Sequence, residues 1–200
     1  MADAMQYSHK KGIVHRDLKP ENVLISIENG KPNAKIADFG IAKIKLSDGD
    51  PLPASGVSYM HTPAGTRLYV APEVYKSHYK EKADIFSLGL MFCAILERRI
   101  DIIRGRSRLM IYYNNIGEVC VGEYLFHHPK AVREVGKSVI IQEAIRKLIN
   151  SMIRCEYKAR PSAREVYDVL NSPMPIIARP EKRNDVQSAE KTWFSYCAIL

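Results

Sequence analysis

Apolar residues recur at helical spacing along much of the chain. Residues 84–96 are apolar on nearly every side of a helix, which predicts a fully buried central helix. Residues 139–153 carry their apolar positions on one face, and residues 2–11 follow a helical pattern that we expect to end at Gly12. The pattern predicts a mainly helical domain.

The last predicted helix follows Pro161, where Ser162-x-x-Glu165 has the sequence of a capping box. Beyond it, residues 173–200 contain three prolines and scattered charges, which are typical of a flexible tail. We therefore expect one domain over residues 1–172 and a tail over residues 173–200.

Two short apolar runs near the start of the chain have the composition of β-strands. Residues 23–27 and 34–37 flank a segment that contains Asn29-Gly30, and Asn-Gly between two such runs predicts a hairpin. Residues 43–66 are rich in Ser, Pro, Gly and Asp, which predicts a long loop of the kind that is functional or mobile.

Composition and charge restrict the function only loosely. A chain of 200 residues with 46% hydrophobic and 26% charged residues suits a soluble globular domain. The net charge of +8 favours acidic peptides, phosphate-rich ligands or an anionic membrane surface, and an uneven basic surface explains it equally well. We expect no nucleic acid partner. The five arginines within residues 98–108 fit either an acidic docking partner or a solvated surface.

The cysteines and the apolar runs indicate in which cellular compartment the protein is located. Four widely spaced cysteines form no CxxC pair, which argues against a zinc site and favours a reducing environment. Residues 1–11 lack the apolar core of a signal peptide, and the uncharged, mainly apolar run of residues 85–96 is too short to span a bilayer. These observations predict an intracellular protein, cytoplasmic or nuclear.

Candidate catalytic residues lie at the two ends of the predicted hairpin. Asp17 and Asn22 precede the first strand, and Asp38 follows the second. An aspartate can orient a hydroxyl and accept its proton, and amide and carboxylate oxygens are ligands for Mg²⁺. Because a hairpin returns the chain to its start, we expect Asp38 to lie near Asn22.

Five motifs, in order, resemble those of the eukaryotic protein kinase family. They are HRDLKPEN at residues 15–22, DFG at 38–40, APE at 71–73, DIFSLG at 84–89 and Arg160-Pro161. The resemblance covers residues 2–172. It implies a mainly α, protein-kinase-like C-terminal lobe in which a small β-hairpin carries the catalytic and DFG loops.

The resemblance also implies a role for each motif residue. Asp17 would be the base that orients the substrate hydroxyl, and Lys19 would offset the charge of the transferred phosphoryl group. Asn22 and Asp38 would hold the Mg²⁺ ions that bridge the phosphates of ATP. Structural and regulatory roles are implied for His15, Arg16, Phe39, Gly40, Asp84 and Arg160, and positioning of the activation segment and substrate for Thr66 and Glu73.

Two long-range contacts follow from the same resemblance. Asp84 is expected to hold the catalytic loop through backbone N–H groups, and Arg160 is expected to pair with Glu73. Arg16 is implied to bind a phosphorylated residue of the activation segment, although each candidate is also an ordinary polar loop residue. The candidates are Ser47, Ser55, Ser58 and Thr62.

The substrate class is indicated by Lys19 together with Thr66. This combination is typical of kinases that phosphorylate serine and threonine in protein substrates, since tyrosine kinases usually have other residues at these positions. Small-molecule kinases share an acid-bearing catalytic loop but generally lack the APE segment, so residues 66–73 argue against them.

The sequence departs from the family pattern in three places. Phe86 stands where tryptophan is usual, and residues 98–138 look like an insert specific to a subfamily. No GxGxxG loop, strand lysine or partner glutamate precedes the catalytic stretch, so we expect the ATP-gripping N-lobe to be missing from this chain. Two hypotheses remain: a serine/threonine kinase that is active in its full-length form, or a truncated, non-catalytic interaction module.

The chain ends in Cys197-Ala198-Ile199-Leu200, which fits a CaaX signal for prenylation of Cys197. One lipid chain gives only weak attachment, so a prenylated Cys197 predicts partial association with membranes. In the alternative, nearby aromatic residues pack the tail against the domain and the cysteine stays unmodified. These residues are Trp193, Phe194 and Tyr196.

Overall fold

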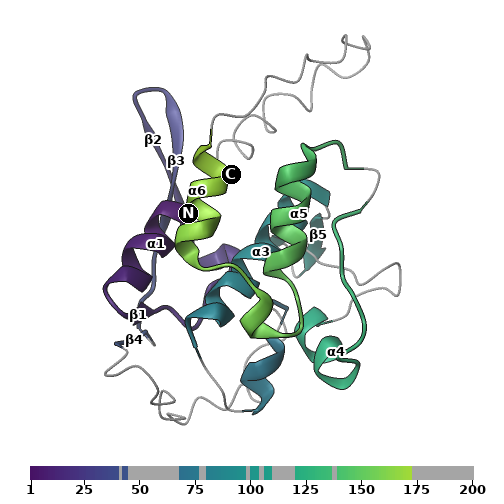
Figure 1. The fold of residues 1–200 in the computed structure, drawn as a ribbon. Helices are drawn as coiled ribbons and strands as arrows, with labels where there is room; N and C mark the ends of the chain where they lie inside the picture. Colours follow the sequence, from purple (N-terminus) through teal and green to yellow (C-terminus); the bar gives the residue numbers. More distant parts are fainter. Residues whose placement is uncertain are drawn as a thin grey trace, which may run out of the picture.

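The computed structural model describes residues 1–40, 42–44, 68–76, 80–97, 100–103, 106–109, 120–136 and 139–172 (Figure 1). In chain order the elements, with η for a 3₁₀ helix, are α1 (Ala2–Lys10), β1 (Ile13–Val14), η1 (Pro20–Asn22), β2 (Val23–Glu28), β3 (Lys31–Ile36), β4 (Lys43–Ile44), η3 (Pro72–Lys76), α3 (Glu81–Glu97), β5 (Ile100–Ile103), β6 (Arg106–Leu109), α4 (Val121–His127), α5 (Glu143–Met152), η4 (Tyr157–Ala159) and α6 (Ala163–Asn171). The described residues are mainly helical, as predicted.

Helix α3 forms the centre of the core. Residues 83–94 of this helix are all buried, and Ile85 and Leu88 have 0% exposed surface. The helix contacts α5, α5 contacts α6, and α6 contacts α1. Gly89 allows the end of α5 to approach, because a Cβ at this position would lie 2.8 Å from the Cβ of Met152. The prediction of a buried central helix is confirmed for residues 84–94, whereas Ile95 and Leu96 are half-buried.

The predicted hairpin is present as β2 and β3, which project from the body of the protein (Figure 1). Asn29 and Gly30 have φ angles of 52° and 74°. Two positive φ angles are typical of a type I′ turn, whose twist matches that of the strands. Since this turn needs only two residues, β3 begins at Lys31, opposite Glu28, and not at residue 34.

Two further strand pairs were not predicted. β1 pairs antiparallel with β4, with Ile13 opposite Ile44, so the first two residues of the predicted loop 43–66 form a strand. β5 pairs antiparallel with β6 within residues 98–138. The remainder of the predicted loop, residues 45–66, and the predicted tail beyond Ser172 lie outside the described residues.

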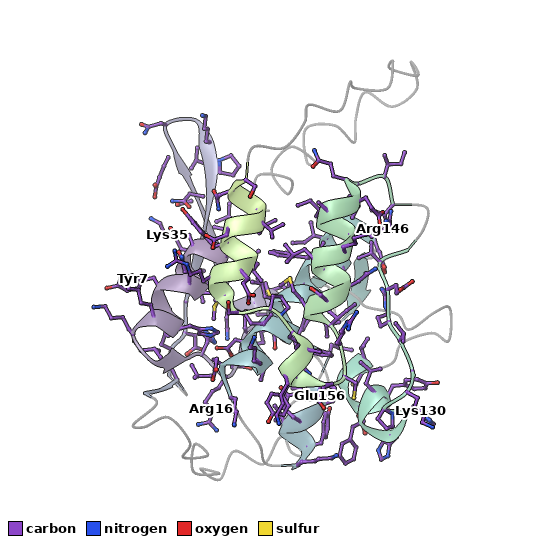
Figure 2. The ribbon with its side chains drawn as sticks, in the orientation of Figure 1. Tyr7, Arg16, Lys35, Lys130, Arg146 and Glu156 are labelled. Atoms are coloured by element: carbon purple, nitrogen blue, oxygen red, sulfur yellow. The ribbon has the colours of Figure 1, made fainter. Side chains whose placement is uncertain are left out.

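The surface helix predicted over residues 139–153 is shorter than expected, because α5 begins at Glu143. Arg146 lies on α5 (Figure 2). Its guanidinium donates to the backbone carbonyls of Val135 at 3.1 Å and Gly136 at 3.0 Å, and also to that of Val139. The Val139 carbonyl thus accepts a hydrogen bond from a side chain. In a helix that included residue 139, it would accept the backbone N–H of residue 143 instead. Residues 139–142 therefore precede the helix.

The capping box at the start of α6 is confirmed. The Ser162 N–H donates to Glu165 Oε2 at 2.7 Å, and the Glu165 N–H donates to Ser162 Oγ at 3.2 Å. Val166, one residue on, is fully buried against the core. None of the helices in the described part of the chain combines the length and apolar character needed to cross a bilayer.

A buried ion pair joins the end of α3 to the segment after α4. Nη2 of Arg133 lies 2.6 and 2.7 Å from the two carboxylate oxygens of Glu97. The Gly136 N–H donates to the same carboxylate at 3.1 Å. The side chains of Arg133 and Glu97 are only 3% and 8% exposed, so the pair is shielded from solvent. It holds together two residues that are 36 positions apart.

Candidate active site

The HRDLKPEN stretch turns sharply after β1, where Asp84 near the start of α3 holds its backbone. Oδ2 of Asp84 accepts the His15 N–H at 2.8 Å, and Oδ1 accepts the Arg16 N–H at 2.9 Å. Asp84 is 0% exposed. Arg16 has a φ of 73°, a left-handed conformation that is uncommon outside glycine. The contact expected of Asp84 is therefore present, and it fixes the backbone directly before Asp17.

Asp17, Lys19 and Asn22 gather around one carboxylate. Nζ of Lys19 lies 2.6 Å from Oδ2 of Asp17. Nδ2 of Asn22 donates to the backbone carbonyl of Asp17 at 2.8 Å and to its Oδ2 at 3.2 Å. Both neighbours bind the same carboxylate oxygen, and no other described residue hydrogen-bonds to Oδ1 of Asp17. This arrangement leaves Oδ1 without a hydrogen-bond partner among the described residues.

His15 links the catalytic loop to the segment that carries Asp38. Its Nε2 lies 3.0 Å from the carbonyl oxygen of Ala37, and the Asp17 N–H donates to its Nδ1 at 3.3 Å. Both contacts are satisfied by the neutral tautomer that carries its proton on Nε2. The ring is fully buried and packs edge-on against Phe39, with centroids 4.7 Å apart. One imidazole therefore aligns both loops of the site.

The hairpin returns Asp38 to the neighbourhood of Asn22, as predicted, since the Ala37 N–H donates to the Asn22 carbonyl at 2.8 Å. Asp38 has a φ of 60°, and its Oδ1 accepts the Gly40 N–H at 3.2 Å. A Cβ at residue 40 would lie 3.0 Å from that oxygen, so glycine suits this turn.

The oxygen atoms of Asn22 and Asp38 fit a magnesium site. Because Asn22 uses its Nδ2 on Asp17, its Oδ1 remains to face a cation. Within the described residues no group of three or more His, Cys, Asp or Glu side chains is arranged to hold a metal by itself. Mg²⁺ is commonly bound by one or two carboxylates together with substrate phosphates and water, so this donor set suits a nucleotide-bound ion.

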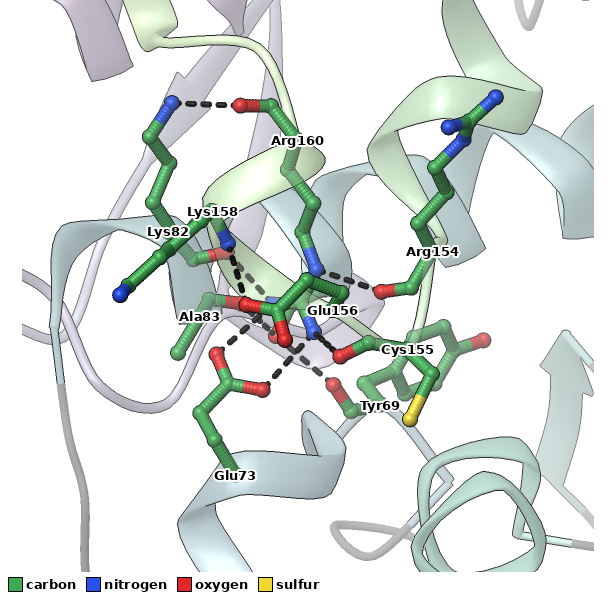
Figure 3. A network of polar contacts seen from close by, with 10 residues as sticks. Tyr69, Glu73, Lys82, Ala83, Arg154, Cys155, Glu156, Lys158 and Arg160 are labelled. Carbon is green, nitrogen blue, oxygen red and sulfur yellow. Dashed lines mark hydrogen bonds and ion pairs between the residues drawn. The ribbon is translucent and has the colours of Figure 1, made fainter. Parts of the chain in front are cut away.

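A second buried cluster joins η3 to the loop before α6 (Figure 3). Nη1 and Nη2 of Arg160 donate to the two carboxylate oxygens of Glu73 at 2.7 and 2.8 Å, which is the ion pair that we expected. The Arg160 side chain is 0% exposed. Its three other N–H groups donate to backbone carbonyls of Arg154, Lys82 and Cys155. All five donors of the guanidinium are thus satisfied.

Two residues of this cluster, Ser87 and Lys82, had no role predicted from the sequence. Ser87 Oγ donates to the Tyr69 carbonyl at 2.7 Å and so holds the backbone that leads into the APE motif. Nζ of Lys82 donates to the Arg160 carbonyl at 2.5 Å, and burial lowers the pKa of this lysine. Burial also raises the pKa of the Tyr69 hydroxyl. Because these contacts join residues 18 and 78 positions apart, no local motif signals them.

Several residues with predicted roles lie outside the described residues, and those roles stay predictions. They are Ser47, Ser55, Ser58, Thr62, Thr66 and Cys197. Arg16, which is predicted to bind a phosphorylated residue of the activation segment, is among the described residues, and only 4% of its surface is exposed.

Comparison with known proteins identifies the family. Residues 1–170 match the protein kinase domain. Over 181 residues the chain is 33% identical to the ovarian-specific serine/threonine-protein kinase Lok of Drosophila melanogaster, an alignment that covers 86% of this chain and 32% of Lok. Over 174 residues it is 33% identical to a probable LRR receptor-like serine/threonine-protein kinase of Arabidopsis thaliana, covering 85% of this chain and 17% of that protein. This chain thus spans less than two thirds of the length of either relative. It belongs to the protein kinase family.

Proposed function

We propose that this chain is the phosphotransfer half of a serine/threonine protein kinase. In its full-length form the kinase transfers the γ-phosphate of ATP to serine or threonine hydroxyls of protein substrates, and residues 1–172 are its C-terminal lobe. The observation that carries the proposal is the cluster of Asp17, Lys19 and Asn22 on a loop held by the buried Asp84. Two serine/threonine-protein kinases among the relatives support the substrate class.

Asp17 and Lys19 act on the reacting groups. Oδ1 of Asp17 orients the substrate hydroxyl and accepts its proton while the hydroxyl oxygen bonds to the γ-phosphorus. The bond from that phosphorus to the bridging oxygen breaks, and ADP leaves. Lys19, whose Nζ lies 2.6 Å from Asp17, offsets the negative charge of the transferred group.

Asn22 and Asp38 are the residues that would hold Mg²⁺, which when bound neutralises the phosphates of ATP. Asn22 offers its amide oxygen, because its nitrogen is engaged by Asp17. Asp38 offers a carboxylate whose orientation is fixed through the Gly40 N–H. Both side chains are therefore oriented by contacts within the protein.

In this proposal a small N-terminal lobe of the full-length form grips ATP. Four large apolar side chains on the hairpin strand β2 and in the DFG motif are exposed, at Leu24, Ile25, Ile27 and Phe39. Exposed apolar surface of this kind is consistent with a further part of the protein covering it. Without this cover, the isolated 200-residue chain is expected to bind ATP weakly and to transfer no phosphate.

The test uses a form of the protein extended by the small lobe and three matched changes of carboxylate to amide. Asp17→Asn and Asp38→Asn alter the site, and Asp3→Asn alters an exposed position of α1. Transfer from radiolabelled ATP is measured with a serine peptide and a tyrosine peptide. We expect both site variants to lose activity by about 10²–10⁴-fold with unchanged circular dichroism, and Asp3→Asn to keep it.

Normal turnover by either site variant would contradict the residue roles. Transfer to the tyrosine peptide alone would contradict the substrate class. An extended protein that folds and transfers no phosphate would favour the non-catalytic interaction module instead.

A further inference from the structure

A cavity of about 400 Å³ lies between two stretches of chain that have no part in the proposed phosphate transfer. One wall is formed within residues 129–134, after α4, and the other within residues 150–159, from the end of α5 to η4. Lys130 lies on the first wall and Glu156 on the second (Figure 2). Cavities that bind ligands commonly have volumes of about 300–1,000 Å³, so this one is large enough to hold a side chain of a partner.

Contacts within the protein fix both walls. The Val135 N–H, beside the first wall, donates to Oδ1 of Asn150 on the second at 2.9 Å. The buried ion pair of Arg133 with Glu97 holds the first wall, and the Arg160 guanidinium donates to two backbone carbonyls of the second at 2.7 and 3.1 Å. The cavity is therefore formed in advance, and filling it does not require the chain to be ordered first.

The cavity combines an apolar interior with a charged mouth. Ile153 lines it and is 1% exposed, so it lies at the inner end, whereas Val132 lines it and is 63% exposed. Lys130 and Arg154 also line it, and both are exposed. Neither of these two cationic side chains makes a hydrogen bond or an ion pair with any residue in the described part of the chain. A ligand that fits the cavity therefore brings an apolar group and meets two available cations.

The acidic residues at the mouth do not cancel this positive charge. Glu134 and Glu156 also line the cavity. Oε1 of Glu156 accepts the backbone N–H of Lys158 at 3.1 Å, so this carboxylate already caps η4. Among the described residues, two available cations thus face one carboxylate without a partner, that of Glu134, and the whole chain carries a net charge of +8. Both the local and the overall charge favour a negatively charged partner.

We propose that this cavity docks an acidic segment of a protein partner. One large apolar side chain of the segment, such as that of leucine or phenylalanine, enters the cavity and packs against Ile153 and Val132. Carboxylates on either side of that residue lie beside Lys130 and Arg154. The apolar side chain supplies affinity because it leaves water, and the charge pairs set the choice and orientation of the partner. The inference concerns binding alone and does not depend on phosphate transfer.

The test uses three acetylated and amidated pentapeptides as probes. The first has phenylalanine between two pairs of glutamates, the second replaces the phenylalanine by alanine, and the third replaces the glutamates by lysines. Each is added to the isotopically labelled 200-residue chain, and the backbone amide signals are followed by NMR. Val132 and Ala159 report on the cavity, and Leu24 and Ile25 report on exposed apolar side chains elsewhere.

One pair of variants tests the cations. Lys130→Gln combined with Arg154→Gln removes both of them from the mouth of the cavity. Lys10→Gln combined with Lys147→Gln removes the same total charge from exposed positions that do not line the cavity, and it serves as the matched control.

A second pair of variants tests the space itself. Ala159 lines the cavity and is exposed, so Ala159→Trp places a large ring at its mouth. Ala144→Trp places the same ring at an exposed position of α5 that does not line the cavity. Binding to both variants is measured at the Val132 amide.

We expect the peptide of glutamates and phenylalanine to shift the amides of Val132 and Ala159 and to leave those of Leu24 and Ile25 in place. Replacement of its phenylalanine by alanine should weaken binding at least about tenfold. Loss of the two cations should weaken it about three- to tenfold. Ala159→Trp should abolish binding, whereas both control variants should match the parent chain.

Three results would overturn the inference. Equal shifts at the cavity and at the hairpin, or no shifts at either place, would show that no docking site is present. Equal loss of binding in the two charge variants would show a general attraction to a basic protein. Binding of the lysine peptide as tight as that of the glutamate peptide, or tighter, would show that the cavity does not select an acidic partner. None of these measurements needs kinase activity, so failure of the proposed function would leave them valid.

Discussion

The guanidinium carbon of Arg160 lies 4.7 Å from the centre of the Phe86 ring. The same guanidinium makes a bidentate ion pair with Glu73, so cation, ring and carboxylate meet in one buried place. Phe86 is 0% exposed, and cation–π attraction is strongest when both partners are out of water. Phenylalanine in place of the tryptophan expected from the family pattern therefore keeps an aromatic face beside this arginine.

Removing Arg160 is expected to destabilise the domain strongly. Arg160→Met leaves the Glu73 carboxylate buried without its cation, and breaking one side of a buried ion pair costs about 3–5 kcal/mol. Arg164→Met is the control, because Arg164 is 77% exposed and lies 3.6 Å from Asp168, a pair worth about 0–1 kcal/mol. Urea unfolding of the chain measures both. Similar losses in the two variants would contradict the buried pair.

Gly122 is expected to tolerate no side chain, since a Cβ there would lie 1.8 Å from the carbonyl oxygen of Val70. Gly122→Ala must push α4 away from the backbone before the APE motif, at an expected cost of about 3 kcal/mol or more. Gly30→Ala provides the comparison, because its φ is +74° and nothing lies within 4 Å of the added carbon. Strain alone should cost about 1–2 kcal/mol there. Thermal unfolding that ranks Gly30→Ala as the worse variant would contradict this contact.

The capping box predicts a pH-dependent contribution to stability. The Ser162 backbone N–H, followed by its hydroxyl, lowers the pKa of Glu165 below its ordinary value of 4.5. Because the folded pKa lies below the unfolded one, the stabilisation is present above the unfolded pKa and is lost as the pH falls through the folded pKa. Glu165→Gln keeps an acceptor but removes the titration. The difference in unfolding free energy between parent and variant should shrink below about pH 4.5, and a constant difference between pH 7 and pH 3 would contradict it.

Cys93 is expected to resist thiol reagents while the chain is folded. Burial, the dominant cause, raises the pKa of its thiol to about 12, so the reactive thiolate is scarce at pH 8. Iodoacetamide followed by peptide mass spectrometry should label Cys93 only after urea is added. Rapid labelling of Cys93 in buffer would show that α3 opens far more readily than its burial implies.

Features with a local cause were predictable from the sequence. Ser162-x-x-Glu165 and Asn29-Gly30 specify a helix start and a turn through atoms a few positions apart, and both predictions are confirmed. Asp84 and Arg160 were placed through the family resemblance and have the contacts expected of them. The predicted start of α5 at residue 139 was wrong, because the start of this helix depends on where the Arg146 guanidinium lies in three dimensions.

Other contacts had no local signal. β1 and β4 are two residues each, too short for a periodic pattern, and they pair only because the loops of the site bring them together. His9 appears in the sequence as one more polar residue at a helix end, since its partner Asp84 is 75 positions away. Such contacts become visible only when the fold has set the distances.

The ion pair between Glu97 and Arg133 has a consequence for how this protein can diverge. The pair joins the two ends of the stretch between residues 97 and 133, whatever the length of that stretch. Within it, α4 packs against η3 and Gly122 meets the backbone of Val70, so a change of length is expected to be tolerated only outside α4. Added length there costs little, since doubling the length of a loop costs only about 0.6 kcal/mol. Insertions outside α4 are therefore expected to leave α3 in place, and with it the carboxylate of Asp84 that holds the catalytic loop.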